Sequence, residues 1–122
     1  RQQSKTLLCP IAVFCEGKEI HCTAKVDTGN TLTEPFSGFP VVVVQESVLP
    51  AEILQQREQT NFRLVPYGAV GGEGILSAFR PEKLTISMGK RNIETKDVYI
   101  AVCPESLSNG EFDALLHPDL LA

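Results

Sequence analysis

One acidic side chain stands out because of where it falls in the sequence. The run Glu19 to Val26 alternates apolar with polar residues, and Asp27-Thr28-Gly29-Asn30 follows it directly. Period-two alternation predicts a half-buried strand, so Asp27 is expected at the mouth of a turn at the strand's end. Gly29 favours a tight turn there because it has no β-carbon to obstruct it. The simplest structural interpretation is an Asx turn, in which Asp27 caps its own loop.

A carboxylate at such a turn could act in acid–base catalysis, but that chemistry needs a partner. Aspartic proteases hold two carboxylates face to face, and this sequence contains one Asp-Thr-Gly. Two like charges held close together cannot both ionise, so such a pair shares one proton. If Asp27 is catalytic, two copies of the chain must therefore come together.

A glycine-rich segment later in the chain could serve the same site. Residues 67–75 read Tyr-Gly-Ala-Val-Gly-Gly-Glu-Gly-Ile, with four glycines in seven positions. A phosphate-binding loop is disfavoured because no Gly-Lys-Ser/Thr follows. A plain hairpin remains open. The alternative is a flap that closes over an extended peptide and excludes water. Its candidate substrate-binding residues are Val70, Gly71, Gly72, Glu73 and Gly74.

Other catalytic chemistries find less support in the sequence. Four cysteines lie inside apolar strand-like runs without a CxxC pair: Cys9, Cys15, Cys22 and Cys103. This is typical of buried, reduced thiols, and a Cys–His nucleophile pair, although still open, lacks an activating helix start. Their spacing from His21 and His117 disfavours zinc, and no Gly-x-Ser-x-Gly is present. We therefore expect no metal and no cofactor.

The remaining patterns predict a mainly β fold. Short apolar runs at 6–14, 19–26, 41–44, 61–65, 84–88 and 98–102 predict strands, with turns at 16–18, 35–40 and 89–92. The last of these turns is expected to join the last two strands as a hairpin. A short helix is expected at 50–56, and a helical turn closes the segment 112–121. Many short strands with little helix favour a closed β-barrel.

Length and charge bound the class of protein. A chain of 122 residues fits one domain, predicted as 6–122 with 1–5 as a linker or arm. The net charge of −4 gives no reason to expect a nucleic-acid partner. No apolar run reaches the length of a membrane span and no signal peptide opens the chain. Because the sequence starts at Arg1, we expect it to be part of a longer protein.

The sequence resembles the sporulation sigma-E factor-processing peptidases in three blocks that together cover nearly the whole chain. The first block runs from Asp27 to Val41, with Asp-Thr-Gly-Asn followed by Leu, an acidic residue and Pro, and then Pro-Val. The other two are Tyr67–Gly71 with Ala78–Pro81, and Leu115–Leu121. The resemblance implies a protease domain like that of retroviral aspartic proteases, corresponding to half of a pepsin-like enzyme.

In proteases of the retroviral type, each subunit of a homodimer donates one Asp-Thr/Ser-Gly loop, one flap and a later apolar-apolar-Gly turn. The resemblance thus implies that Asp27 is catalytic and that Thr28, Gly29 and Asn30 support the active-site loop. Leu115-Leu116 takes the apolar-apolar position, and His117 stands where the viral enzymes have Gly. Asn30 replaces the usual Ala and adds a polar group close to the carboxylate.

The same resemblance implies a place in the cell and a set of partners. The implied substrate is a sigma factor precursor that loses an N-terminal segment. A secreted signalling protein would act through an N-terminal membrane domain, with the protease domain on the cytoplasmic face of the membrane. Two alternatives stay open: a non-catalytic retroviral-protease-like module that binds peptide or dimerises, and a regulatory β-domain.

Overall fold

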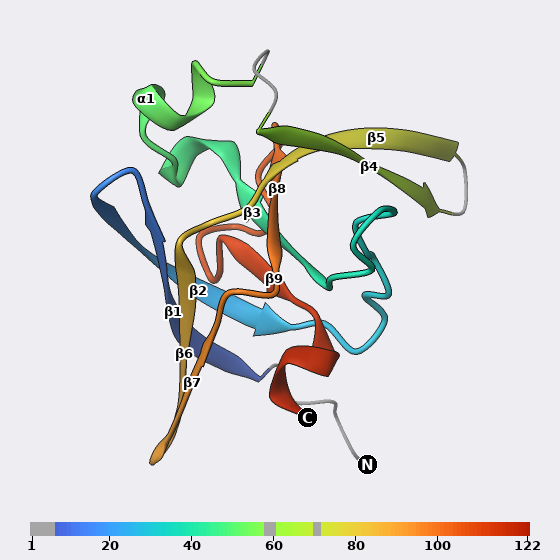
Figure 1. Cartoon of the computed structure of the whole chain (residues 1–122). Helices are drawn as coiled ribbons and strands as arrows, with labels where there is room; N and C mark the ends of the chain where they lie inside the picture. The colour runs from blue at the N-terminus through green and yellow to red at the C-terminus, as the bar shows by residue number, and fades with distance from the viewer. Residues whose placement is uncertain (1–6, 58–60, 70–71) are drawn as a thin grey trace.

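The computed structural model describes residues 7–57, 61–69 and 72–122, and these ranges form one nine-stranded sheet with the order β4-β5-β8-β3-β9-β2-β1-β6-β7 (Figure 1). The strands are β1 (Leu8–Cys15), β2 (Lys18–Val26), β3 (Val41–Gln45), β4 (Phe62–Ala69), β5 (Gly72–Phe79), β6 (Lys83–Met88), β7 (Arg91–Thr95), β8 (Tyr99–Cys103) and β9 (Ala114–Leu116). The helical elements are α1 (Ala51–Leu54) and the 3₁₀ helices η1 (Glu46–Val48) and η2 (Pro118–Leu121).

The mainly β prediction is confirmed, but the closed barrel is wrong. Within the described ranges the sheet ends at β4 on one side and β7 on the other. The reason lies in the two outer hairpins, which extend in different directions (Figure 1). β5 pairs with β8 only through Ser77–Phe79, and the rest of the β4–β5 hairpin continues beyond the sheet. The two edges therefore do not meet.

The first hairpin confirms the strand that leads to Asp27. β1 and β2 pair from Leu8↔Lys25 to Cys15↔Lys18, around a turn in which Glu16 and Gly17 have φ values of 54° and 72°. Two positive φ values are the signature of the turn that matches the twist of antiparallel strands. The alternating apolar residues of β2 are buried as expected: Ile20, Cys22 and Ala24.

The hairpin predicted between 84–88 and 98–102 is wrong. After Gly89 the chain enters β7, which pairs with β6, whereas β8 pairs in parallel with β3 and antiparallel with β5. β7 is an edge strand with Arg91, Asn92 and Glu94 exposed. Its sequence therefore carries no hydrophobic signal by which it could be recognised.

β3 is buried on both faces and separates two hydrophobic clusters. Val42 and Val44 belong to the main core with β1, β2 and β6, while Val41 and Val43 pack with β8 and the base of the β4–β5 hairpin. A strand covered on both faces reads as an unbroken apolar run, which is why residues 41–44 are all valine. The loop that contains Asp27 lies beside this strand.

Candidate active site

The structure brings the Asp27 turn beside Leu115–His117; this predicted second turn is the end of β9 followed by the extended His117 that precedes η2. β2 and β9 run parallel with Val26 opposite Leu116, and the Asp27 N–H donates to the Leu116 carbonyl at 3.0 Å. Parallel strands end at the same edge, so the two segments that follow them are neighbours. The two segments are far apart in the sequence, and both contain predicted site residues.

The Asp27 loop is an Asx turn whose carboxylate is half-buried. Oδ1 accepts a hydrogen bond from the Gly29 N–H at 3.2 Å, and the Asn30 N–H donates to the Asp27 carbonyl at 2.9 Å. A β-carbon at Gly29 would lie 3.6 Å from Asp27 Oδ1, which is ordinary contact. The turn itself therefore does not require glycine, and the prediction that a β-carbon would obstruct it is wrong. Thr28 and Gly29 are exposed, so both are accessible to a ligand or a second subunit.

Asn30 attaches this loop to β3. Its side chain is buried, with Nδ2 donating to the Val41 carbonyl at 3.2 Å and Oδ1 accepting from the Leu32 N–H at 2.9 Å. The Val41 N–H in turn donates to the Leu32 carbonyl at 3.1 Å. The amide group thus connects the loop to β3. These hydrogen bonds satisfy the polar side chain in its buried position.

Glu34 is a second anchor, which the sequence analysis quoted only as part of a motif. Its carboxylate is 1% exposed and accepts hydrogen bonds from the Ser37 hydroxyl at 2.6 Å and from the N–H groups of Ser37 and Phe36 at 2.7 and 3.1 Å. Burial would raise the pKa of this carboxyl, but the hydrogen bonds and the positive charge of Arg63 lower it below its ordinary value. Glu34 is therefore a buried anion that closes the loop before β3.

A cavity of about 370 Å³ opens at Asp27, and the β4–β5 hairpin forms part of its wall. Its lining combines both turns, β3 and the hairpin: Asp27, Gly29, Asn30, Thr31, Leu32, Val43, Tyr67, Gly68 and Leu115. A half-buried carboxylate in a concave site is the arrangement expected of a catalytic or binding group. Tyr67 and Gly68 were not named as site residues, although an aromatic residue beside a glycine run was a signal for them.

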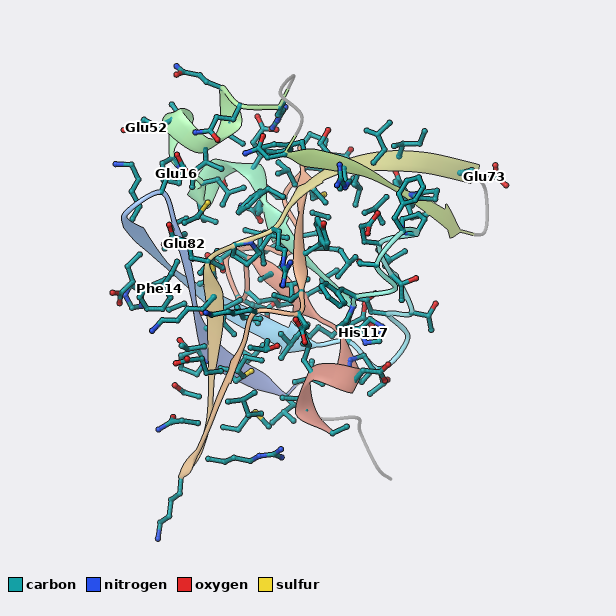
Figure 2. All side chains as sticks on the ribbon, viewed as in Figure 1. Phe14, Glu16, Glu52, Glu73, Glu82 and His117 are labelled. Atoms are coloured by element: carbon teal, nitrogen blue, oxygen red, sulfur yellow. The ribbon has the colours of Figure 1, made fainter. Side chains whose placement is uncertain are left out.

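The glycine-rich segment forms the two-stranded hairpin that both interpretations of it expected, and its role as a flap stays a prediction. β4 and β5 pair from Phe62↔Phe79 to Ala69↔Gly72. Of the predicted flap residues, Val70 and Gly71 lie outside the described residues. Gly72 begins β5, and Glu73 is exposed near the far end of the hairpin (Figure 2). Gly74 lies opposite Tyr67 in the register.

His117 has a structural place in the second turn. It is 4% exposed, and its Nδ1 accepts a hydrogen bond from the Asp119 N–H at 3.1 Å, which caps η2 (Figure 2). A ring nitrogen that accepts this bond carries no proton, so the Asp119 carboxylate 4.0 Å away is not an ion-pair partner in this state. Leu115 lines the cavity, whereas Leu116 is fully buried beneath it.

Three of the four cysteines do not offer an activated nucleophile in the described structure. Cys9, Cys15 and Cys22 are buried free thiols. Burial, assisted by the charges of Glu16 and Glu82, raises the pKa of Cys15 to about 11. Burial and the charge of Asp113 raise the pKa of Cys22 to about 12. Such thiols stay protonated at neutral pH. Over the same described residues, no group of three or more His, Cys, Asp or Glu side chains could hold a metal ion.

Within 7–57, 61–69 and 72–122, no helix has the length and apolar character needed to cross a membrane.

Several proteins are similar to this chain in sequence. The chain is 27% identical to the sporulation sigma-E factor-processing peptidase of Bacillus subtilis, over 84% of this chain and 41% of that protein. It is 30% identical to a putative sporulation sigma factor-processing peptidase of Bacillus thuringiensis subsp. kurstaki, over 85% of this chain and 78% of that protein. A probable sporulation sigma-E factor-processing peptidase of Clostridium acetobutylicum is 29% identical, over 95% of this chain and 43% of that protein.

The chain thus spans about two fifths of the length of the Bacillus subtilis and Clostridium relatives. A family-level match covers more of the chain. Residues 1–120 match the profile of the Peptidase_U4 family, described as sporulation factor SpoIIGA. Since this match includes both turns and the hairpin that surround the Asp27 cavity, the chain belongs to the Peptidase_U4 family of SpoIIGA sporulation factors.

Proposed function

We propose that residues 6–122 form an aspartic endopeptidase domain of the retroviral type that works as a homodimer. Asp27 is the catalytic group, and each subunit donates one. The observation that carries the proposal is the position of the Asp27 carboxylate, half-buried in the cavity where the β2 turn, the β9 turn and the β4–β5 hairpin meet. The exposed Thr28 and Gly29 are the loop positions available to the other subunit.

The mechanism follows from two carboxylates that share one proton. At a separation of about 3 Å the pair cannot carry two negative charges, so one member stays protonated. The ionised Asp27 takes a proton from a bound water, which attacks the scissile carbonyl. The protonated Asp27 of the other subunit donates a hydrogen bond to that carbonyl oxygen. The pair titrates as a unit, so its two apparent pKa values belong to the dimer.

The substrate class comes from the names of the relatives and from the resemblance in sequence. Three relatives are named as peptidases that process a sporulation sigma factor. The proposed reaction is therefore removal of an N-terminal pro-segment from a sigma factor precursor. In the full-length protein, membrane spans would precede this domain and hold it on the cytoplasmic face. A secreted signalling protein would act on those spans.

Replacing Asp27 tests the proposal. We expect Asp27→Ala in the full-length protein to abolish cleavage of a co-expressed sigma factor precursor, because the dyad loses both carboxylates. Immunoblotting of precursor and product measures the effect. Asp97→Asn, which changes an exposed carboxylate paired with Arg80, serves as the matched control and should leave cleavage intact.

Retained cleavage by a folded Asp27→Ala variant would rule the mechanism out. The alternative of a non-catalytic binding module makes the opposite prediction. It expects the precursor to bind wild type and Asp27→Ala equally, with no product in either case.

A further inference from the structure

Tyr67 on β4 lies across Gly74 on β5. The two residues are directly opposite in the hairpin. A β-carbon at position 74 would come within 2.5 Å of Tyr67 Cζ and 2.6 Å of Cε1, closer than real β-carbons approach other atoms. A side chain at position 74 would therefore have to displace the Tyr67 ring, which is the outer end of an exposed side chain.

Tyr67 lines a cavity on the hairpin itself, together with Gly74, and also two further cavities that share lining residues. A second cavity of about 490 Å³ adjoins the one at Asp27. Both are lined by Leu32, Val43, Tyr67 and Leu115. Of these shared residues, Tyr67 is the one contributed by the hairpin. Its side chain is 39% exposed, so the ring borders open space and is not packed into the core.

The second cavity has a mainly apolar wall with a hydrogen-bond donor that lacks a partner. Leu76 and Val102 extend the apolar lining beyond the shared residues. Arg57 also lines this cavity; its Nη2 donates to Glu46, but its Nε is buried without a hydrogen-bond partner among the described residues. This Nε has almost no accessible surface, so a ligand in the cavity would meet the apolar lining and not this donor.

An extended peptide fits two such adjoining cavities because its side chains alternate. Residues i and i+2 of a strand point to the same side, about 6.6 Å apart at a rise of 3.3 Å per residue. One such side chain would enter the Asp27 cavity and the next would enter the second cavity.

We propose that Tyr67 is a specificity-determining residue. Because Gly74 leaves room for its ring, Tyr67 divides the binding groove into two side-chain subsites, and the second cavity selects a bulky apolar side chain two residues from the one in the Asp27 cavity. This inference rests on the proposed action on extended peptides. It assigns to the β4–β5 hairpin a part in substrate choice as well as in covering the site.

The pair Tyr67–Gly74 allows a sharp kinetic test in the full-length protein. The probes are synthetic peptides that copy the processed region of the sigma factor precursor, with Leu, Phe or Ser placed in turn at each position near the cleaved bond. We expect wild type to prefer Leu or Phe over Ser at one such position by tenfold or more in kcat/KM, since a lost apolar group in a pocket costs roughly 10- to 200-fold.

Tyr67→Ala and Gly74→Ala should each reduce this preference to about threefold or less, because one removes the ring and the other displaces it. Tyr67→Phe keeps the ring and should keep the preference. In the Tyr67→Ala background, Gly74→Ala should add little, since there is no ring left to displace. An unchanged preference in Tyr67→Ala, or an equal effect of Gly74→Ala in both backgrounds, overturns the proposal.

A binding measurement separates this proposal from the proposed function. Cys103 lines the second cavity and is the half-buried cysteine of the four. In Asp27→Asn full-length protein, the Leu or Phe peptide should slow alkylation of Cys103 by iodoacetamide, and the Ser peptide should slow it far less. Mass spectrometry of the Cys103 peptide gives the rate, with Cys103→Ser as control.

Protection of Cys103 without any cleavage by wild type would sink the proposed function and leave the subsite standing. Cleavage by wild type with equal alkylation rates under all peptides would overturn the subsite and leave the protease standing.

Discussion

At the scale of residues, the site depends on two buried polar side chains in the loop that follows Asp27. Asn30 and Glu34 each turn inward and satisfy backbone N–H and C=O groups of the loop between β2 and β3. A buried polar group costs free energy unless it is hydrogen-bonded, so a loop that satisfies both of them is strongly favoured over other conformations. They position Asp27 by fixing the loop to β3.

Glu34→Gln should lower stability because an amide cannot accept hydrogen bonds with both of its ends. We expect a loss of about 1–3 kcal/mol in the free energy of unfolding at pH 7, measured by urea denaturation. Ser37→Ala removes the hydroxyl that donates to Glu34 and accepts from the Phe39 N–H, but it leaves the buried carboxylate with its backbone donors, so it should cost less.

The difference in stability between wild type and Glu34→Gln should depend on pH. The pKa of Glu34 is lowered on folding from the ordinary value of 4.5, so its carboxylate stabilises the fold above that pH and this stabilisation is lost as the pH falls through the folded-state pKa. Wild type should therefore lose its advantage over Glu34→Gln in acid. A gap between the two that stays constant from pH 7 down to pH 2 would contradict this role.

Sequence reasoning located Asp27 because its signal is local. The alternation of β2 and the turn that follows are contained in a dozen neighbouring residues. The inward orientation of Asn30, the burial of Glu34 and the ring of Tyr67 over Gly74 could not be read in the same way. Each depends on a residue of another strand or turn, and a single sequence does not state which strands pair.

At the scale of elements, the three-residue strand β9 joins the two halves of the site. It pairs in parallel with β2 and antiparallel with β3. Asp113 precedes it and is bonded to both neighbours: its carboxylate and N–H contact the backbone of Thr23, and its carbonyl accepts from the Gln45 N–H. A short strand held on both edges fixes the Leu116 carbonyl that receives the Asp27 N–H.

Leu116→Ala tests how firmly β9 holds Asp27. The side chain is 0% exposed, so its truncation should cost about 2–5 kcal/mol and loosen the adjacent turn. We expect a lower melting temperature together with a lower kcat against the sigma factor precursor. Leu64→Ala, at a leucine that is 65% exposed, is the matched control and should change stability by less than about 0.5 kcal/mol. A Leu116→Ala protein as stable as this control would disprove the role.

Element pairing marks the limit of the sequence prediction. Strands 19–26 and 41–44 were identified because their burial patterns, alternating and continuous, are distinctive. β7 was missed because a polar edge strand has no such pattern. β8 was given the wrong partner because its true neighbours, β3 and β5, are far away in the sequence.

At the scale of the whole molecule, one chain supplies one candidate catalytic carboxylate, Asp27. The sheet that positions it ends in a hairpin on each side. Nothing in a single described chain supplies a second Asp-Thr-Gly turn to Asp27. The proposed dyad therefore makes activity a property of the assembled pair. The open sheet edges show why a barrel prediction based on strand number failed: strand count says nothing about where the first and last strands end up.

Dilution of the purified full-length protein in detergent should reveal this dependence. We expect the activity per subunit to fall as the dimer dissociates, and to return when the protein is concentrated. Mixing wild type with an excess of Asp27→Asn should also lower the activity per wild-type subunit, since mixed pairs contain one ionisable Asp27. Activity per subunit that is constant at all concentrations, and unaffected by the excess variant, would show that one chain suffices.

The hydrogen bond between Asp27 and Leu116 also sets the order in which the protein becomes competent during its synthesis. The ribosome makes Asp27 well before β9, the strand that fixes its position. Contacts between distant segments form only after both have been made and the intervening chain has closed into a loop. A nascent chain therefore lacks a positioned Asp27 carboxylate until translation has passed β9.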